Sequence, residues 1–135
     1  MKKIIMPLMI ILLTGCLGEV GKGYITKECK KTENINGMTQ ETSVEIRSKQ
    51  GKIEKITITE TYDKNLDLQS ITNSKKSEQN TYKNIDGIKV DINENIFAYT
   101  IEPDLIKDEI KDKFNIKDEQ HKQINYYEEN GYTCK

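Results

Sequence analysis

Tryptophan is absent from this chain of 135 residues, which also has a single histidine and only two prolines. Basic and acidic residues nearly cancel, 21 against 22, so no excess of positive charge is available for binding nucleic acid. One histidine and no Cys-x-x-Cys pair argue against a zinc site. The sequence also lacks a nucleophile elbow, a P-loop and a dinucleotide-binding glycine motif. The common signatures of these classes are therefore missing.

The sequence has no apolar run long enough to span a membrane, which takes about 18 residues. Its one apolar run covers residues 4–13, follows Lys2 and Lys3, and ends in Leu13-Thr14-Gly15-Cys16. This tetrapeptide resembles the lipobox of bacterial lipoproteins, in which the signal is removed and the cysteine is acylated. A run of this length can also be a buried core helix. Its terminal position, the lysines and the cysteine at its border favour an export signal.

The lipobox predicts a location and a domain plan. Residues 1–15 form a lipoprotein signal peptide, residues 16–23 a short lipidated tether, and residues 24–135 one extracytoplasmic domain. Two or more acyl chains on Cys16, palmitate among them, would anchor the chain stably at the extracytoplasmic face of the cell membrane. Loss of the signal removes two lysines and leaves three more acidic than basic residues.

With Cys16 assigned to lipid, two cysteines remain, Cys29 and Cys134. An even pair in an exported domain predicts a disulfide. Such a bridge closes a loop of roughly 100 residues and stabilises by about 4–5 kcal/mol in the chain-entropy model. The alternative is a reactive thiol near His121. Two free thiols outside the cytoplasm would tend to oxidise, which favours the disulfide.

The first half of the domain has the alternation of antiparallel strands. Asn36-Gly37 and Gln50-Gly51 are turn signals between alternating segments. Ile53 is out of phase with Ile56, which predicts a bulge between them. The row Thr57, Thr59 and Thr61 then points away from the core, so the opposite sheet face is at least partly wet. The strands predicted here are residues 24–31, 42–49 and 52–62.

The second half mixes helices and one hairpin. A helix is expected in the later part of residues 63–86, fraying near Ser74, with Tyr82 and Ile85 on one face and Gly87 as its cap. Residues 88–92 and 97–101 form a hairpin around Asn93-Glu94-Asn95. Further elements are a helix from Pro103 with the stripe Ile106, Ile110 and Phe114, a helix from Asp118 with Ile124 and Tyr127 inward, and a short strand at residues 132–134.

This order of elements predicts an α+β fold, in which an antiparallel β-sheet carries helices packed on one face of a single small domain. Several segments also resemble the YehR-type small bacterial lipoproteins. They are the lipobox, Cys29 followed by Lys31-Thr32-Glu33, the strand from Lys55 to Tyr62, the segment from Tyr82 to Ile88, and the closing Gly-Tyr-Thr-Cys-Lys. The resemblance implies a small α+β lipoprotein of unassigned function and supplies no active-site residues.

Three patterns in the sequence resemble sites of chemistry. Asp91, Asn93, Asn95 and Glu102 mimic part of an EF-hand loop, but Ile96 stands where its glycine should be, so a hairpin is favoured. The tyrosines Tyr126, Tyr127 and Tyr132 form either a ligand-binding patch or, as we expect, one buried ring and a rim. The third pattern is a row of carboxylates interleaved with lysines, typical of a solvated helix: Asp104, Asp108, Glu109, Asp112, Asp118 and Glu119.

We therefore expect no catalytic residue, no metal and no cofactor. The predicted function is that of a membrane-anchored lipoprotein whose domain is a small binding or interaction module. Its partners would be the membrane, through Cys16, and an envelope protein, a peptide or a small ligand, with no nucleic acid. The alternative is an envelope-associated enzyme, or an enzyme accessory subunit, that acts through surface carboxylates.

Overall fold

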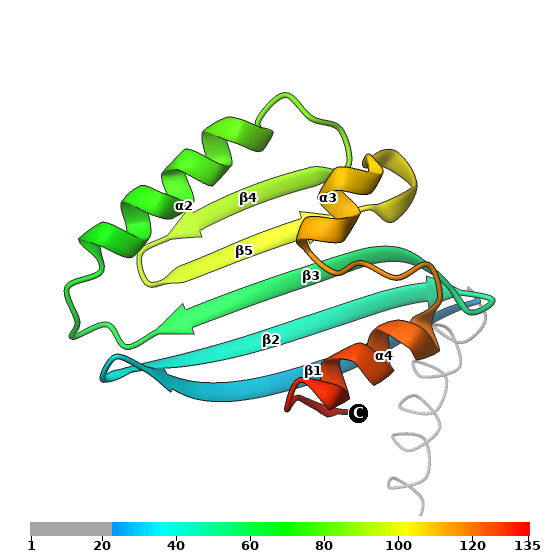
Figure 1. Cartoon of the computed structure of the whole chain (residues 1–135), viewed down its shortest axis with the longest axis horizontal. Coiled ribbons are helices and arrows are strands. Elements are labelled where there is room, and N and C mark those ends of the chain that lie inside the picture. The colour runs from blue at the N-terminus through cyan, green and yellow to red at the C-terminus, as the bar shows by residue number, and fades with distance from the viewer. Residues whose placement is uncertain (1–22) are drawn as a thin grey trace, which may run out of the picture.

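The core of the protein is a six-stranded antiparallel sheet in the order β4-β5-β3-β2-β1-β6 (Figure 1). The computed structural model describes residues 23–135, so the predicted signal peptide, Cys16 and residues 17–22 of the tether lie outside the described residues. Within residues 23–135, three α-helices accompany the sheet, which confirms the predicted α+β class. The strands are β1 (Tyr24–Ile35), β2 (Met38–Lys49), β3 (Lys52–Tyr62), β4 (Ile88–Asn93), β5 (Ile96–Ile101) and β6 (Thr133–Cys134). The helices are α2 (Gln69–Tyr82), α3 (Asp108–Lys113), α4 (Gln120–Glu129) and the short 3-10 helix η1 (Pro103–Leu105).

Strands β1 and β2 form a hairpin longer than the sequence predicts. Asn36 and Gly37 both have positive φ, 53° and 82°, as a two-residue turn with the twist of its strands requires. The Asn34 carboxamide accepts a hydrogen bond from the Gly37 N–H. The pairing therefore closes immediately beside the turn, so β1 extends to Ile35 and β2 begins at Met38.

The predicted bulge in β3 is confirmed. Ser48 pairs with Ile53 and Arg47 with Lys55, which leaves Glu54 as the extra residue. The bulge returns Ile56 and the later alternating residues to the correct face. Buried strand side chains, such as Val44, Ile46 and Ile56, all project to one face, here called the helix face. The opposite face, here called the open face, carries Thr57, Thr59 and Thr61, as predicted.

Helix α2 differs from its prediction at both ends. It is continuous through Ser74, so the expected fraying there is wrong. It ends at Tyr82, which is buried, and Ile85 lies beyond it and is exposed. Gly87 is not a helix cap. It adopts φ +86° in the turn before β4, where a β-carbon would meet the Leu105 side chain at 2.6 Å.

The helical segment from Pro103 is broken where one continuous helix was predicted. After η1, Ile106 is extended (φ −98°, ψ 154°) and buried, and α3 starts only at Asp108. Helix α4 starts two residues later than predicted because the Asp118 carbonyl accepts a hydrogen bond from the Ile53 N–H at 3.1 Å. At Ile106 and at Asp118, contacts with the sheet hold the backbone in a non-helical conformation.

The chain end returns to the sheet. Strand β6 pairs with β1, and Cys134 lies directly opposite Cys29, with their Cα atoms 4.0 Å apart in a disulfide. The β4–β5 turn is Glu94-Asn95 rather than the expected three residues, since Asn93 pairs with Ile96. The buried Asn95 donates a side-chain hydrogen bond to the Tyr62 carbonyl at 2.6 Å, which ties this turn to the end of β3.

Candidate functional site

The residues of the EF-hand mimic are held apart by the hairpin. Asp91 and Asn93 lie on β4 and Asn95 in the turn. Glu102 follows β5 at the other end, where its N–H donates to the Gly87 carbonyl. Over residues 23–135, no group of three His, Cys, Asp or Glu side chains is arranged to hold a metal ion.

Three of the six helical carboxylates lie in ion pairs with lysines. Lys122 donates to Glu119 at 2.6 Å and lowers the pKa of that carboxyl, with the His121 ring 3.4 Å away on the other side. Asp104 pairs with Lys52 at 3.0 Å, and Asp118 with Lys111 at 3.7 Å. The six carboxylates are spread over η1, α3 and the start of α4 and do not converge.

The three late tyrosines form an edge-to-face stack. Tyr127 is buried and lies between Tyr126 and Tyr132, at ring-centroid distances of 5.3 and 4.9 Å. Burial raises the pKa of the Tyr127 phenol. Tyr126 and Tyr132 are half-buried, so one ring of the predicted pair packs inward and the other covers a rim, as expected.

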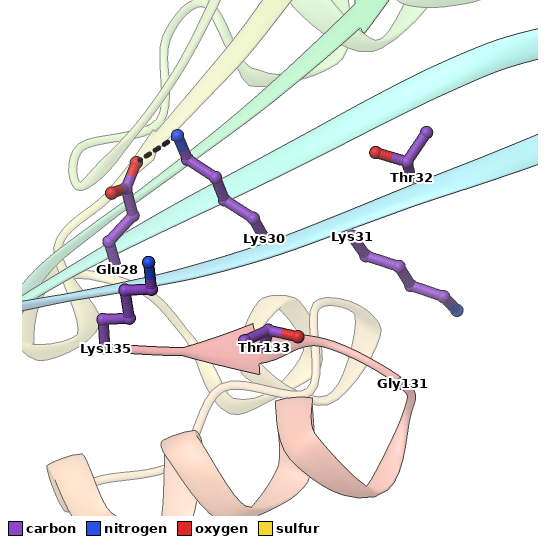
Figure 2. A pocket seen from close by; sticks show the side chains of 7 residues that line it. All are labelled: Glu28, Lys30, Lys31, Thr32, Gly131, Thr133 and Lys135. Atoms are coloured by element: carbon purple, nitrogen blue, oxygen red, sulfur yellow. Dashed lines mark ion pairs between the residues drawn. The ribbon is translucent and has the colours of Figure 1, made fainter.

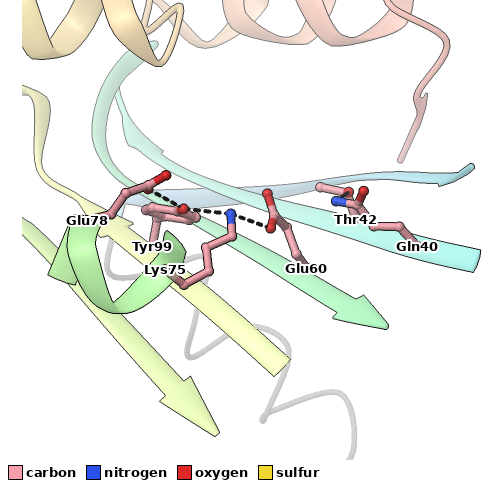
Figure 3. Close-up of polar contacts among 6 residues, drawn as sticks. All are labelled: Gln40, Thr42, Glu60, Lys75, Glu78 and Tyr99. Carbon is pink, nitrogen blue, oxygen red and sulfur yellow. Dashed lines mark hydrogen bonds and ion pairs between the residues drawn. The ribbon is translucent and has the colours of Figure 1, made fainter. Parts of the chain in front are cut away.

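A cluster of polar side chains that the sequence did not predict joins α2 to the helix face of the sheet (Figure 3). The Lys75 ammonium donates to the Tyr99 hydroxyl at 2.7 Å and pairs with Glu60 at 2.7 Å. The Tyr99 hydroxyl in turn donates to the Glu78 carboxylate at 2.5 Å. Burial and the Glu78 hydrogen bond raise the pKa of Tyr99 far above its usual range. We call these four residues the Tyr99 junction.

The Tyr99 junction is best explained as a fastening for α2. Lys75 and Glu60 expose only 13% and 18% of their side chains, and Gln79 donates to the Val90 carbonyl at 2.9 Å. Helix α2 has a single buried residue, Tyr82, so these polar contacts replace the apolar stripe that usually docks a helix. The sequence signal was the polar segment at residues 73–80, whose partners lie on other strands.

A hollow lies along the outer edge of β1, beside β6 (Figure 2). It has a volume of about 470 Å³ and is open to solvent. Three lysines line it against a single acidic residue, Glu28, which pairs with Lys30 at 3.3 Å. Its lining residues are Glu28, Lys30, Lys31, Thr32, Gly131, Thr133 and Lys135.

The same edge leaves backbone groups without partners. Glu28 exchanges both of its hydrogen bonds with Lys135, so the even-numbered residues of β1 direct their N–H and C=O toward this edge. Strand β6 and Lys135 cover only Glu28, Cys29 and Lys30 of the twelve residues of β1. Among residues 23–135, Thr26, Thr32 and Asn34 have no ladder partner there. We call this segment, with its lysines, the β1 edge.

A smaller hollow of about 390 Å³ lies between α2 and α3. Tyr82, Ile85 and Ile110 give it an apolar wall, and Lys107 and Lys113 stand at its rim. Lys113 donates to the Tyr82 hydroxyl at 2.7 Å, so one of these cations is already engaged.

Compared with known protein families, curated proteins and solved structures, the chain has no match in any of the three. The YehR-type resemblance gains no support from these comparisons and stays a prediction. Within residues 23–135, no helix is both long and apolar enough to cross a membrane.

Proposed function

We propose that this protein is a lipid-anchored interaction module of the bacterial envelope that binds an extended, acidic polypeptide segment by strand addition at the β1 edge. The observation that supports it is a twelve-residue strand of which β6 and Lys135 face only three residues, with three lysines lining the hollow beside it. Unpaired N–H and C=O groups on an edge strand are a template for another strand.

The chemistry of the edge favours a carboxylate-bearing partner. A strand added at Thr32 and Asn34 would gain main-chain hydrogen bonds. Its successive side chains would point to opposite faces, one toward the face of Lys30 and the next toward the face of Lys31. Lys31 already bonds Glu33 at 2.5 Å, and this contact raises the pKa of its ammonium. An incoming carboxylate would exchange with such local pairs, which are worth little in water.

Strand addition can be tested with two synthetic peptides, one alternating Thr and Glu and one alternating Thr and Lys, titrated against the full chain by fluorescence anisotropy. We expect the peptide with glutamates to bind and the peptide with lysines not to bind. Thr32→Pro removes an outward N–H without breaking a bond to β2, and we expect it to weaken binding at least tenfold.

The charge requirement is tested by the pair Lys30→Glu and Lys135→Glu, expected to abolish binding of the acidic peptide. The matched control is Lys76→Glu with Lys83→Glu. It changes one exposed lysine within α2 and one directly after it, and should leave the affinity for the peptide unchanged. Equal affinity for both peptides, or full binding by a folded Thr32→Pro variant, would rule out the proposal.

The anchor is tested separately. Mass spectrometry of membrane-extracted protein should show an acylated Cys16 at a new N-terminus, and Cys16→Ser should abolish acylation and membrane retention. An intact Met1 in the membrane fraction would refute the lipoprotein assignment while leaving the β1 edge open to the peptide test. The alternative, an envelope-associated enzyme or an enzyme accessory subunit acting through surface carboxylates, stays a prediction.

A further inference from the structure

Four basic residues face one another across the β2–β3 hairpin. Arg47 pairs with Lys55, and Lys49 pairs with Lys52. Directly opposed side chains of an antiparallel pair lie about 5 Å apart at Cβ, where like charges destabilise the sheet. We call Arg47, Lys49, Lys52 and Lys55 the basic cluster. Two successive like-charge pairs carry a cost in stability that an anionic partner would relieve.

Few acidic groups of the described chain offset this cluster. Lys52 pairs with Asp104 at 3.0 Å, both side chains being well exposed. Within residues 23–135, Arg47, Lys49 and Lys55 make no ion pair within 4 Å. Arg47 and Lys49 instead lie over the Tyr24 ring, at 3.9 and 5.5 Å from its centroid. The ring holds both cations side by side.

The cluster lies where the described chain begins. Tyr24, the first residue of β1, pairs with Lys49, and Figure 1 shows β1 starting at the end of the sheet that carries the β2–β3 turn. We call this the tether end. Only residues 17–23 separate it from Cys16. At no more than about 3.6 Å per residue, this segment spans at most about 25 Å. A lipid on Cys16 would therefore keep the cluster near the bilayer.

Apolar side chains are exposed at the same end. Leu105 and Ile25 are the two most exposed large apolar residues of the described chain, at 57% and 54%. Leu105 belongs to η1, which the Lys52–Asp104 pair ties to the start of β3. Ile25 follows Tyr24, and its carbonyl accepts from Ser48 and Gln120. Exposed apolar groups at the same end of the sheet as cations and a tyrosine suit the boundary of a lipid bilayer.

We infer that the tether end docks on anionic lipid headgroups of the membrane that carries the anchor, through the basic cluster, with Ile25 and Leu105 reaching the acyl boundary. The inference rests on the lipid anchor proposed above and assigns it a second, electrostatic contact. One acyl signal combined with a basic patch is a known route to stable membrane attachment. Docking at this end would direct β1 away from the membrane. Thr32 would then lie about 27 Å along the strand from Tyr24, where the β1 edge is free to bind.

The test uses the full, lipidated chain in vesicles of phosphatidylcholine alone or with one-third phosphatidylglycerol. Amine acetylation followed by mass spectrometry measures the reactivity of each lysine. We expect Lys49, Lys52 and Lys55 to react at least threefold more slowly in the anionic vesicles. Lys76 and Lys89, on α2 and β4, are internal controls and should react equally in both. High salt should remove the protection.

A charge variant makes the test specific. Lys55→Glu creates an opposite-charge pair with Arg47, so the variant should fold at least as stably, yet lose most of the protection at Lys49 and Lys52. The matched control Lys83→Glu should keep it. Flotation with phosphatidylcholine vesicles reports the anchor alone. Protein that floats but shows the same lysine reactivity in both vesicles would overturn the docking inference and leave the anchor standing. Failure to float would reject the anchor, and with it this inference.

Discussion

Tyr99 contacts both charged and aromatic side chains on the helix face. Its hydroxyl lies between the Lys75 ammonium and the Glu78 carboxylate, and its ring packs 5.3 Å from Phe114. The hydroxyl thus separates two half-buried charges on one helix while joining both to β5. Such a shared group matters more than a single surface hydrogen bond because two ions lose a partner together when it is removed.

We predict that Tyr99→Phe lowers the free energy of unfolding by about 1–2 kcal/mol, since Lys75 and Glu78 lose a hydrogen bond that water replaces poorly. Denaturant titration measures this change. The matched control is Tyr126→Phe, a half-buried tyrosine of α4, expected to cost less than about 0.5 kcal/mol. Equal effects of the two substitutions would show that the Tyr99 junction does not stabilise the fold.

Gly87 is a second position at which adding or removing a single side-chain atom should change the stability of the fold. Its φ of +86° and the neighbouring Leu105 and Ile106 side chains leave no room for a β-carbon. We predict that Gly87→Ala costs at least about 2 kcal/mol by thermal or denaturant unfolding. Gly37→Ala shares the positive φ but meets nothing within 4 Å, and should cost about 1 kcal/mol. A smaller cost at Gly87 than at Gly37 would contradict the close packing of this turn.

At the scale of elements, α2 shows how a polar helix is held. Its sequence between Asn73 and Asn80 offers no apolar stripe, so periodicity alone predicted fraying. The helix is continuous because Lys75, Glu78 and Gln79 find partners on the sheet. None of these partners is a sequence neighbour, so the local pattern could not reveal them.

Strand β6 has only two residues and depends on its bridge. Cys29 and Cys134 are 105 residues apart, so the disulfide closes nearly the whole domain. We predict that Cys29→Ser with Cys134→Ser costs about 4–5 kcal/mol in the chain-entropy model. Hydrogen exchange should then be faster at Glu28 and Lys135, whose backbone bonds hold β6 in place. Two titratable thiols in the untreated protein would refute the bridge.

At the scale of the whole molecule, the tyrosines couple folding to alkaline pH. Burial raises the pKa of Tyr62, Tyr99, Tyr127 and Tyr132 above the usual value of 10.0. The unfolded chain releases these protons near pH 10, whereas the folded chain retains them. The stabilisation is therefore complete below pH 10 and is lost as the pH rises above it.

We predict that the free energy of unfolding is nearly level from pH 7 to about 9 and falls steeply above about pH 10. Denaturant titrations at each pH, together with tyrosinate absorbance, measure this decline. Part of the tyrosinate signal should appear only on unfolding. A free energy of unfolding that does not change between about pH 9 and 11 would contradict the burial of these phenols.

The strands were largely predictable and the helical end was not. Ile56 and Ile58 alternate with threonines, so period and bulge gave the face of β3 correctly. Ile106, Ile110 and Phe114 also repeat as a helix should, yet Ile106 is extended because its burial against the sheet outweighs helix propensity. The β1 edge and the basic cluster were not foreseen, since each depends on which strands become neighbours.

By itself, the sequence determined the α+β class, the faces of the strands, both early turns and the pairing of Cys29 with Cys134. These follow from local periodicity, turn chemistry and the number of cysteines. Only the tertiary structure decided that β6 leaves most of β1 uncovered, that four cations meet across one hairpin, and that a polar helix is held by Tyr99. Those features are juxtapositions of residues distant along the chain. The order of strands in the sheet creates them, and hydrophobic periodicity does not specify that order.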